Sequence, residues 1–400
     1  MKKPTLLNLC KSALYVGTVG YGGPAILAQM KKTFVHKNAW LSEKEFMESL
    51  SLAQILPGAT GVSIMGYIGY KLHKLWGAIL VPLSFVLPAV IAITLAAWAY
   101  FRFGNLSAVQ PLFKGLGALV VALLVNATLK LGQSVFGKKI SIKNDYKGFL
   151  ITIFAFVGIY FLKINTIWLI IMSGILGILF YYFTGEFEGE KSKNAEDISL
   201  SVHERKTGKI SSYLPLFILI AIIVTSLILA STRGLFENFF KIGLFAFGGG
   251  FTSIPLIQHI VVDQLHWLSF AQFRDGIALG QITPGPVFIT ATFIGYKVSG
   301  IIGALAATLA VFLPSLILMI TLSKVHNSIK HLRIVKVIVA GFLAGFIGLL
   351  IAITLQFGFK SLLDWQTWLI FSLSIVWLLA LKKEAVWAIL ATAVISLLIF

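Results

Sequence analysis

The stretch LAQILPGATGVSIMGYIGY, from Leu52 to Tyr70, decides the fold of this chain. It lies within a charge-free run, residues 49–70, that is long enough to cross a bilayer. Pro57-Gly58 near its middle predicts a break, because proline removes a backbone donor and clashes with the preceding turn. In hydrocarbon the freed backbone groups find no water, so a broken helix must line a cavity or lie buried in protein.

A related stretch, LGQITPGPVFITATFIGYK from Leu279 to Lys297, repeats this pattern in the second half of the chain. Two interrupted membrane helices at corresponding positions are the sequence feature that best predicts the binding site of a transporter.

The composition is that of a membrane protein. Of 400 residues, 58% are hydrophobic and 12% charged, and the mean hydropathy is +0.91. Soluble domains carry about twice that charged fraction. The formal charge of +18 reflects basic residues at the cytoplasmic ends of membrane helices, so we expect lipid contact and no nucleic-acid binding. The single cysteine, Cys10, excludes an internal disulfide.

Largely apolar runs predict an all-α, polytopic membrane protein with about 12–13 transmembrane segments. The predicted spans are residues 10–30, 49–70, 76–101, 112–130, 148–162, 164–183, 211–232, 238–262, 276–297, 299–323, 337–359, 365–381 and 385–400. We divide the chain into an N-terminal repeat (1–183), a polar linker (184–212) and a C-terminal repeat with one extra leading span (213–400). The distribution of Lys and Arg predicts the N-terminus inside and the C-terminus outside.

The two halves align as an internal repeat. Gly22-Gly23 falls on Gly248-Gly249, Trp40-Leu41-Ser42 on Trp267-Leu268-Ser269, and Pro57-Gly58 on Pro284-Gly285, always at an offset of 226 or 227. The repeats begin at the first and eighth predicted spans, and an odd number of crossings makes them face opposite ways. Inverted repeats predict a site at their interface near the midplane, whereas the alternative is a duplication kept only for packing.

The residues at the breaks favour an anionic substrate. Glycine lets the backbone approach a ligand closely, and the N-termini of half-helices carry partial positive charge. The broken segments hold neutral donors and no acidic residue, whereas a cation site normally shows Asp or Glu. Close helix packing and interhelical hydrogen bonding are the alternative roles. The candidate substrate-binding residues are Gly22, Gly23, Pro24, Gln54, Pro57, Gly58, Thr60, Gly248, Gly249, Gly250, Gln281, Thr283, Pro284, Gly285 and Pro286.

A few charged residues lie near the breaks, and each has two interpretations. Glu48 and Asp275 stand at matching positions at the start of the broken spans. They are either gating or proton-coupling groups or partners of the helix dipole. Lys114 near the start of a span either attracts an anion or snorkels to the interface.

Enzymatic function is not expected. The stretch GQSVFGKK (132–139) has Lys139 where a phosphate-binding loop needs Ser or Thr, so the chain cannot hydrolyse ATP by that route. HExxH and GxSxG motifs are absent, and the histidines lack clear metal-ligand spacing, so no cofactor or metal is expected.

The motifs GYGGP (20–24), KNAWLSEKEF (37–46), QILPG (54–58), IGYK (68–71) and GAILVPLSFVLP (77–88) recur as AFGGG, HWLSFAQF, QITPGP, IGYK and GALAATLAVFLP. This pattern resembles the chromate transporter (CHR) family in its two-repeat, single-chain form. The resemblance implies a multi-pass permease of the bacterial inner membrane that exports chromate, a sulfate-like oxyanion, and gives chromate resistance.

Several alternatives stay open at this stage, including whether the Pro-Gly segments span the membrane or are re-entrant. A permease or channel for another anion such as sulfate has the same sequence features, and a membrane scaffold without flux is the rival from another class. The sequence also leaves open whether two copies associate as a homodimer. Pro-Gly-Ala (57–59) against Pro-Gly-Pro (284–286) suggests that the halves contribute unequally.

Overall fold

The computed structural model describes residues 4–104, 106, 107, 109–137, 140, 145–183, 230–322 and 333–400, and this part of the chain is helical throughout. The predicted linker and most of the predicted span 211–232 lie outside the described residues. The first half contains α1 (Leu6–Val19), α2 (Gly23–Lys31), η1 (Lys32–Lys37), α3 (Glu43–Ile55), α4 (Thr60–Phe103), α5 (Gln110–Phe136), α6 (Tyr146–Tyr160), α7 (Thr166–Gly177) and η2 (Ile178–Tyr182).

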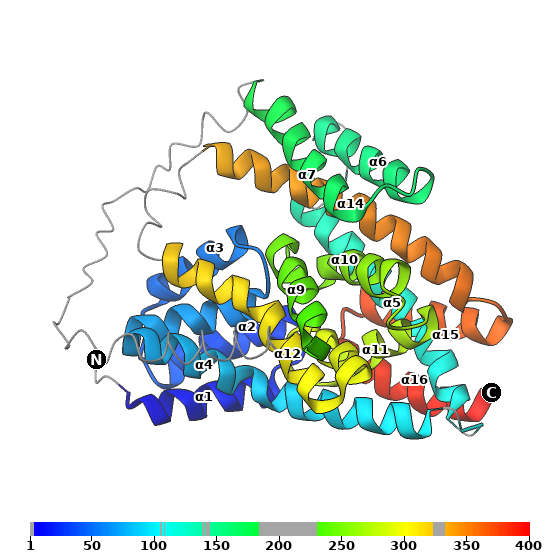
Figure 1. Cartoon of the computed structure of the whole chain (residues 1–400), viewed down its shortest axis with the longest axis horizontal. Helices are drawn as coiled ribbons and strands as arrows, with labels where there is room; N and C mark the ends of the chain where they lie inside the picture. The colour runs from blue at the N-terminus through cyan, green and yellow to red at the C-terminus, as the bar shows by residue number, and fades with distance from the viewer. Residues whose placement is uncertain are drawn as a thin grey trace.

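The second half follows the same order (Figure 1). It contains α9 (Ala230–Phe245), η3 (Gly250–Thr252), α10 (Ser253–Gln258), η4 (His259–Gln264), α11 (Phe270–Ile282), η5 (Val287–Ile289), α12 (Thr290–Leu322), α14 (Arg333–Ser361), α15 (Trp365–Ile375), η6 (Val376–Ala380) and α16 (Ala385–Ile399).

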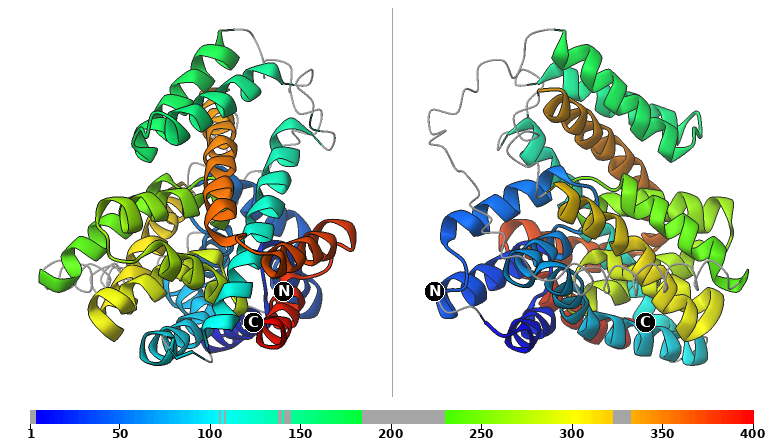
Figure 2. Two further views of the ribbon diagram at one scale, coloured as in Figure 1. Left: turned by 90° about the vertical axis from the view of Figure 1, so that its right-hand side faces the viewer. Right: turned by 60° about the vertical axis from the view of Figure 1, so that its left-hand side comes forward.

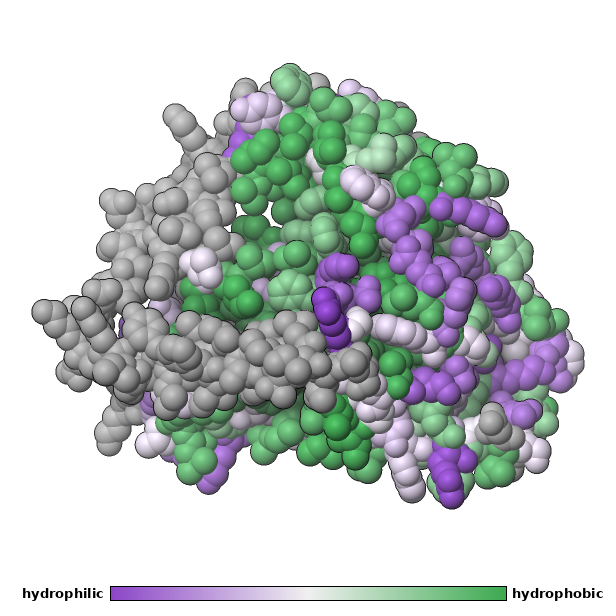
Figure 3. Space-filling model, viewed as in Figure 1, coloured by the Kyte–Doolittle hydropathy of each residue, from purple (hydrophilic) through white to green (hydrophobic). Residues whose placement is uncertain are grey.

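The outer surface is apolar in the way that a lipid-facing surface requires. Four described helical segments are long and apolar enough to cross a membrane: Thr60–Phe103, Gln110–Phe136, Val287–Thr321 and Arg333–Ser361. Large apolar side chains point outward every three or four residues along α7–η2 and α16. They are Trp168, Met172, Ile175, Leu179, Trp387, Leu390, Val394 and Leu397. Apolar atoms also cover the upper part of the molecule in Figure 3, where α6, α7 and α14 lie.

Helix α4 is two helices joined by an abrupt turn. His73 and Lys74 leave helical geometry, and a Cβ placed on Gly69 would lie 2.1 Å from the carbonyl oxygen of Gly77. In a straight helix these two residues would lie about 12 Å apart along the axis. The chain therefore doubles back at His73, and the two limbs touch through glycine backbone.

The same turn recurs in α12. Ser299 and Gly300 have nearly the dihedral angles of His73 and Lys74, and Gly295 meets Gly303 across the turn. The two turns lie 226 residues apart, so the repeat predicted from sequence extends to backbone geometry.

The Pro-Gly breaks are reversals of direction. The Lys71 ammonium lies 2.7 Å from a carboxylate oxygen of Glu45, which places the end of α4's first limb beside the start of α3. We define hairpin 1 as residues 43–72, with its tip at Pro57-Gly58. Its limbs are 13 residues long, about 20 Å, and are too short to cross the roughly 30 Å hydrocarbon core. The predicted break at Pro57-Gly58 is present, but residues 49–70 form part of a re-entrant hairpin and not a single crossing.

Hairpin 2, residues 270–298, repeats this arrangement. A Cβ on Gly276 would lie 2.6 Å from the ring of Phe293, and one on Gly280 would lie 2.8 Å from the Thr290 hydroxyl. These pairs run antiparallel about a tip at residues 284–286. Each hairpin starts with a complete capping box, Ser42 with Glu45 and Ser269 with Gln272, which satisfies the first N–H groups of α3 and α11.

The two repeats run in opposite directions. Ala89 packs on Gly285, and further along the same limb Phe101 stacks on Tyr296, so the second limb of α4 runs parallel to the first limb of α12. Because α12 doubles back at Ser299, its second limb runs opposite to the corresponding limb of α4. The predicted inverted arrangement is thus present, and the two hairpins approach the centre from opposite faces.

The remaining helices interlock the halves. Helix α5 packs against α15 and α16, whereas α14, its counterpart, packs against α6 and α7 (Figures 1 and 2). Small residues allow the close approach: Gly341 of α14 meets Gly177, and the Thr152 hydroxyl donates to the carbonyl of Ala344 at 2.9 Å. The long helix of each repeat, α5 or α14, therefore packs against the last helices of the other repeat. The division at residues 183 and 213 stays a prediction.

Replacing Gly69 by alanine tests the helical turn. Its Cβ would clash with the Gly77 backbone, which cannot move aside as a side chain end can, so we expect destabilisation by about 1–3 kcal/mol. The measurement is the apparent melting temperature of the detergent-purified protein. Gly358→Ala in α14 is the control, since the Val121 methyl at 4.0 Å leaves room there. Equal melting temperatures for the two variants would contradict the close approach of the limbs.

Candidate functional site

The tips of both hairpins meet the glycine-rich breaks of the opposite repeat. The N–H of Gly58 donates to the carbonyl of Ala246 at 2.7 Å, and the N–H of Gly285 donates to the carbonyl of Gly20 at 3.0 Å. Ala246 and Gly20 are equivalent positions, as are Gly58 and Gly285, so the two bonds are related by the repeat. A short parallel bridge between Tyr21 and Gly285 extends the second contact. The candidate site is this junction between repeats.

Both tip positions require glycine. Gly58 and Gly285 have φ of +96° and +117°, where other residues are strained. A Cβ on Gly58 would lie 2.7 Å from the Ser315 Cβ, and one on Gly285 would lie 2.8 Å from the Ala89 Cβ. Ser315 and Ala89 are themselves equivalent, each following the proline of a long limb. The tips are therefore packed against the opposite repeat. This burial is required because irregular backbone within a membrane must be covered by protein or line a cavity.

Gly22 and Gly249 have a different environment. Their φ values are +70° and +112°, and a Cβ on either would meet no atom of the described residues within 4 Å. Backbone at both positions therefore borders open space beside the tips. Gly248 and Gly250 are crowded instead, by the side chains of Leu343 and Val287. Gly23 and Pro24 form the first turn of α2, and nothing is described of their side chains.

The helix ends at the junction lack side-chain caps. Within the described part of the chain, α2, α4, η3 and η5 begin at Gly22, Ala59, Gly249 and Pro286 without a capping hydrogen bond. Six helices that begin elsewhere (α1, α3, α6, α7, α11 and α15) have one, although α5 and α16 do not. Uncapped N-termini expose N–H groups and the positive end of the dipole. The junction therefore concentrates donors suited to an anion.

The predicted polar side chains are not equivalent between the repeats. Gln54 is exposed on hairpin 1, whereas Gln281 is half-buried and its Nε2 has no partner among the described residues. Thr283 donates to its own helix, and Thr60 is half-buried at the start of α4. Buried Ser63, one turn beyond Thr60, also has an unpaired hydroxyl within the described structure. Pro57 is buried and Pro284 and Pro286 are half-buried at the tips.

Glu48 and Asp275 also differ. Glu48 is half-buried on hairpin 1, whereas Asp275 is 4% exposed and lies between the two repeats. It accepts a hydrogen bond from the Tyr100 hydroxyl at 2.9 Å and two from Arg274, at 3.0 and 2.9 Å. Sequence reasoning missed Arg274 and Tyr100. The available signal was that Met47 stands where the second repeat has Arg274.

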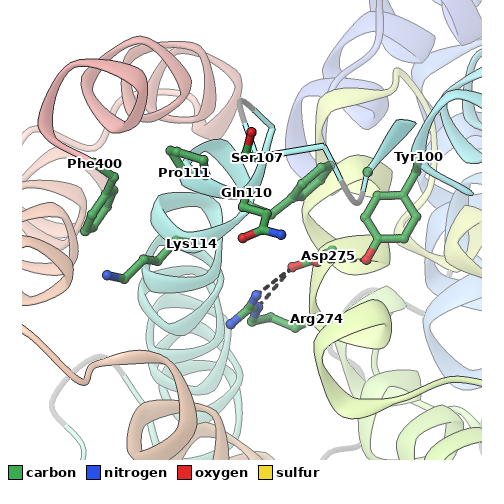
Figure 4. A pocket seen from close by; sticks show the side chains of 10 residues that line it. Tyr100, Ser107, Gln110, Pro111, Lys114, Arg274, Asp275 and Phe400 are labelled. Carbon is green, nitrogen blue, oxygen red and sulfur yellow. Dashed lines mark hydrogen bonds and ion pairs between the residues drawn. The ribbon is translucent and has the colours of Figure 1, made fainter. Parts of the chain in front are cut away.

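A cavity of about 510 Å³ opens beside this cluster, between the end of α4, the start of α5 and the base of hairpin 2 (Figure 4). Arg274, Asp275, Tyr100, Gln110 and Lys114 line it. Among the described residues, no group of three or more His, Cys, Asp or Glu side chains is placed to hold a metal ion.

Two re-entrant hairpins in inverted repeats, meeting at an uncapped junction, define the chain as a polytopic membrane transport protein. It belongs to the chromate transporter family, whose profile matches residues 7–178 and 233–397, once in each repeat. The match confirms the resemblance that the sequence motifs indicated.

The relatives are transport proteins of similar length. The chain is 34% identical to an uncharacterized transporter of Methanocaldococcus jannaschii, over 95% of this chain and 90% of the relative. It is 31% identical to a chromate transport protein of Cupriavidus metallidurans, over 95% and 89%. A probable chromate transport protein of Synechococcus elongatus is also 31% identical, over 92% and 88%. No solved structure matches the chain significantly.

A compensating pair of substitutions tests the seat of hairpin 2. Gly285→Ala should destabilise the protein because its new methyl meets the Ala89 Cβ and its φ is strained. Ala89→Gly removes the atom in conflict, so the double variant should recover part of the loss, with a coupling of about 1 kcal/mol or more. Apparent melting temperatures of the wild type, both single variants and the double variant give this coupling. Simple additivity would show that the tip does not rest on α4.

Proposed function

We propose that this protein exports chromate from the bacterial cytoplasm as a secondary transporter of the inner membrane, and that the junction of the hairpin tips binds the oxyanion. The observation that carries the proposal is the set of uncapped helix N-termini beside open space at Gly22 and Gly249. The broken segments supply backbone N–H groups and neutral side chains and contain no acidic residue that would repel a dianion. The chromate transport proteins among the relatives support chromate as the substrate.

The driving force for export does not require ATP. Moving one charge across the membrane is worth about 2.3 kcal/mol per 100 mV, so a dianion leaving an inside-negative cell gains roughly twice that. Coupling to protons is compatible with this direction. The basic residues near the predicted inner ends of the helices support an orientation with the N-terminus inside.

The contact of each hairpin tip with the opposite repeat favours alternating access over an open pore. The two tips are held by Gly58–Ala246 and Gly285–Gly20 hydrogen bonds to the opposite repeats. Since the hairpins enter from opposite faces, each one can act as the barrier for its own side. Sulfate has the same shape and charge as chromate, and neutral donors do not distinguish the two, so sulfate transport is the second candidate.

Flux into oriented vesicles tests the proposal. In inside-out vesicles from cells producing the protein, radiolabelled chromate should accumulate when the interior is made positive, and cold sulfate should compete if it is also a substrate. Vesicles without the protein give the background. Equal uptake with and without the protein would exclude chromate transport. Concentrative uptake driven by a proton gradient would identify a coupled carrier, and passive equilibration a channel.

Replacing Gly58 by leucine should remove transport. Its side chain cannot fit against Ser315 or adopt φ of +96° without strain, so the tip would leave the junction. We expect cells to lose chromate tolerance and to accumulate chromate like cells without the protein. Gly61→Ala, where the nearest contact is a flexible Met30 end at 3.4 Å, serves as the control. Full tolerance with Gly58→Leu at normal protein levels would refute a role for the tip.

A further inference from the structure

The cavity at the base of hairpin 2 is built around two cations. Arg274 is largely buried, with 15% of its side chain exposed, and Lys114 is 46% exposed at the cavity wall. Both line the same space, and the guanidinium edge of Arg274 faces the region between Gln110 and Lys114 (Figure 4). An arginine buried to this extent is held in a fixed orientation, which suits recognition of an oxyanion.

Each cation has a carboxylate partner. Arg274 binds one oxygen of Asp275 with two of its five N–H groups, and the Lys114 ammonium lies 2.5 Å from Asp364. The hydrogen bond from Lys114 lowers the pKa of the Asp364 carboxyl, which lies between α14 and α15, so this carboxyl is charged at neutral pH. The cavity therefore offers cations whose partners an arriving dianion can replace.

The arrangement belongs to one repeat only. Met47 occupies the position of Arg274 in hairpin 1, so the equivalent cation is missing there. Gly117 of α5 makes room for Arg274, because a Cβ at Gly117 would lie 2.8 Å from its Nε. The sequence symmetry is therefore broken at this position, and the cavity at hairpin 2 has Arg274 where hairpin 1 has Met47.

The cavity lies at the base of hairpin 2, and the tip of this hairpin lies at the junction. Asp275 at the cavity and Gly285 at the tip are ten residues apart, and the part of α11 between them, residues 275–282, is about 11 Å long. The Tyr100 hydroxyl ties Asp275 to α4 of the other repeat. An anion that takes Arg274 from Asp275 would leave the Asp275 carboxylate with the Tyr100 hydroxyl as its remaining described partner.

We propose that this cavity is a second binding site for tetrahedral dianions, with Arg274 and Lys114 as its cationic ligands, through which the transported oxyanion passes on one face of the membrane. The inference rests on the proposed transport of an oxyanion and adds a site outside the junction. Binding there exchanges the carboxylate partners of the two cations for substrate.

Thiol labelling measures binding at the cavity without any transport. Cys10 is the single cysteine, so Ser107→Cys on a Cys10→Ser background places one thiol in the cavity lining. A sulfonate-bearing methanethiosulfonate should label it several-fold faster than a reagent of the same size bearing a trimethylammonium group. Sulfate or molybdate, which do not oxidise thiols as chromate does, should slow the labelling. Equal rates for the two reagents, and no protection by either anion, would overturn the proposal.

Transport kinetics of Arg274 variants test whether the site lies on the pathway. Arg274→Met, the residue of the other repeat, should raise the half-saturating chromate concentration about ten-fold or more, as expected for a lost charge-assisted hydrogen bond. Arg274→Lys should lose less, and Lys114→Gln should show a smaller rise. The matched control is Arg233→Gln, an exposed arginine paired with Glu237 on α9.

Arg274→Met removes the cation beside the buried Asp275 carboxylate, which destabilises the fold. Lys114→Gln at the exposed wall leaves that carboxylate paired, so it provides a kinetic test independent of folding. If anions protect the thiol at position 107 while Arg274→Met and Lys114→Gln both leave the transport kinetics unchanged, the cavity does not lie on the transport pathway. Absent chromate flux in the wild type, together with clear anion protection of the thiol, would refute the proposed function and leave the binding site standing.

Discussion

The structure depends on how the chain satisfies its backbone where two membrane helices are broken. At each Pro-Gly tip an N–H group has lost its helical partner and has no water to bind. The partner is a carbonyl of the opposite repeat, at Ala246 for Gly58 and at Gly20 for Gly285. Neither repeat can make these bonds alone, so the breaks and the inverted pairing of the repeats require one another.

The same constraint explains the glycines. Where a tip is seated, as at Gly58 and Gly285, a side chain would collide with the opposite repeat. Where the helices turn back, as at Gly69 and Gly295, a side chain would collide with backbone of the neighbouring limb. At Gly22 and Gly249 the space is open and only the positive φ calls for glycine. These positions are where backbone donors and room for a ligand coincide.

Two-fold symmetry holds in the backbone and fails in the side chains. The turns, tips and capping boxes correspond closely between the repeats. Asp275, by contrast, accepts hydrogen bonds from Tyr100 and Arg274. Its counterpart Glu48 lacks the neighbouring arginine, because Met47 stands at that position. A symmetric scaffold holds each tip against the opposite repeat, and asymmetric charges make the bases of the two hairpins different.

The sequence by itself determined the membrane class, the duplication, the position of both breaks and the family. These features are local or repetitive: hydropathy, the constraint at proline and the spacing of identical residues can all be seen in a linear sequence. Only the tertiary structure decided that residues 49–70 turn back instead of crossing, since a kink and a reversal use the same Pro-Gly and differ in whether Lys71 reaches Glu45. It also decided which residues share a cavity. Tyr100 and Arg274 are separated by more than 170 positions and meet because antiparallel limbs of two repeats bring them together, which no local pattern specifies.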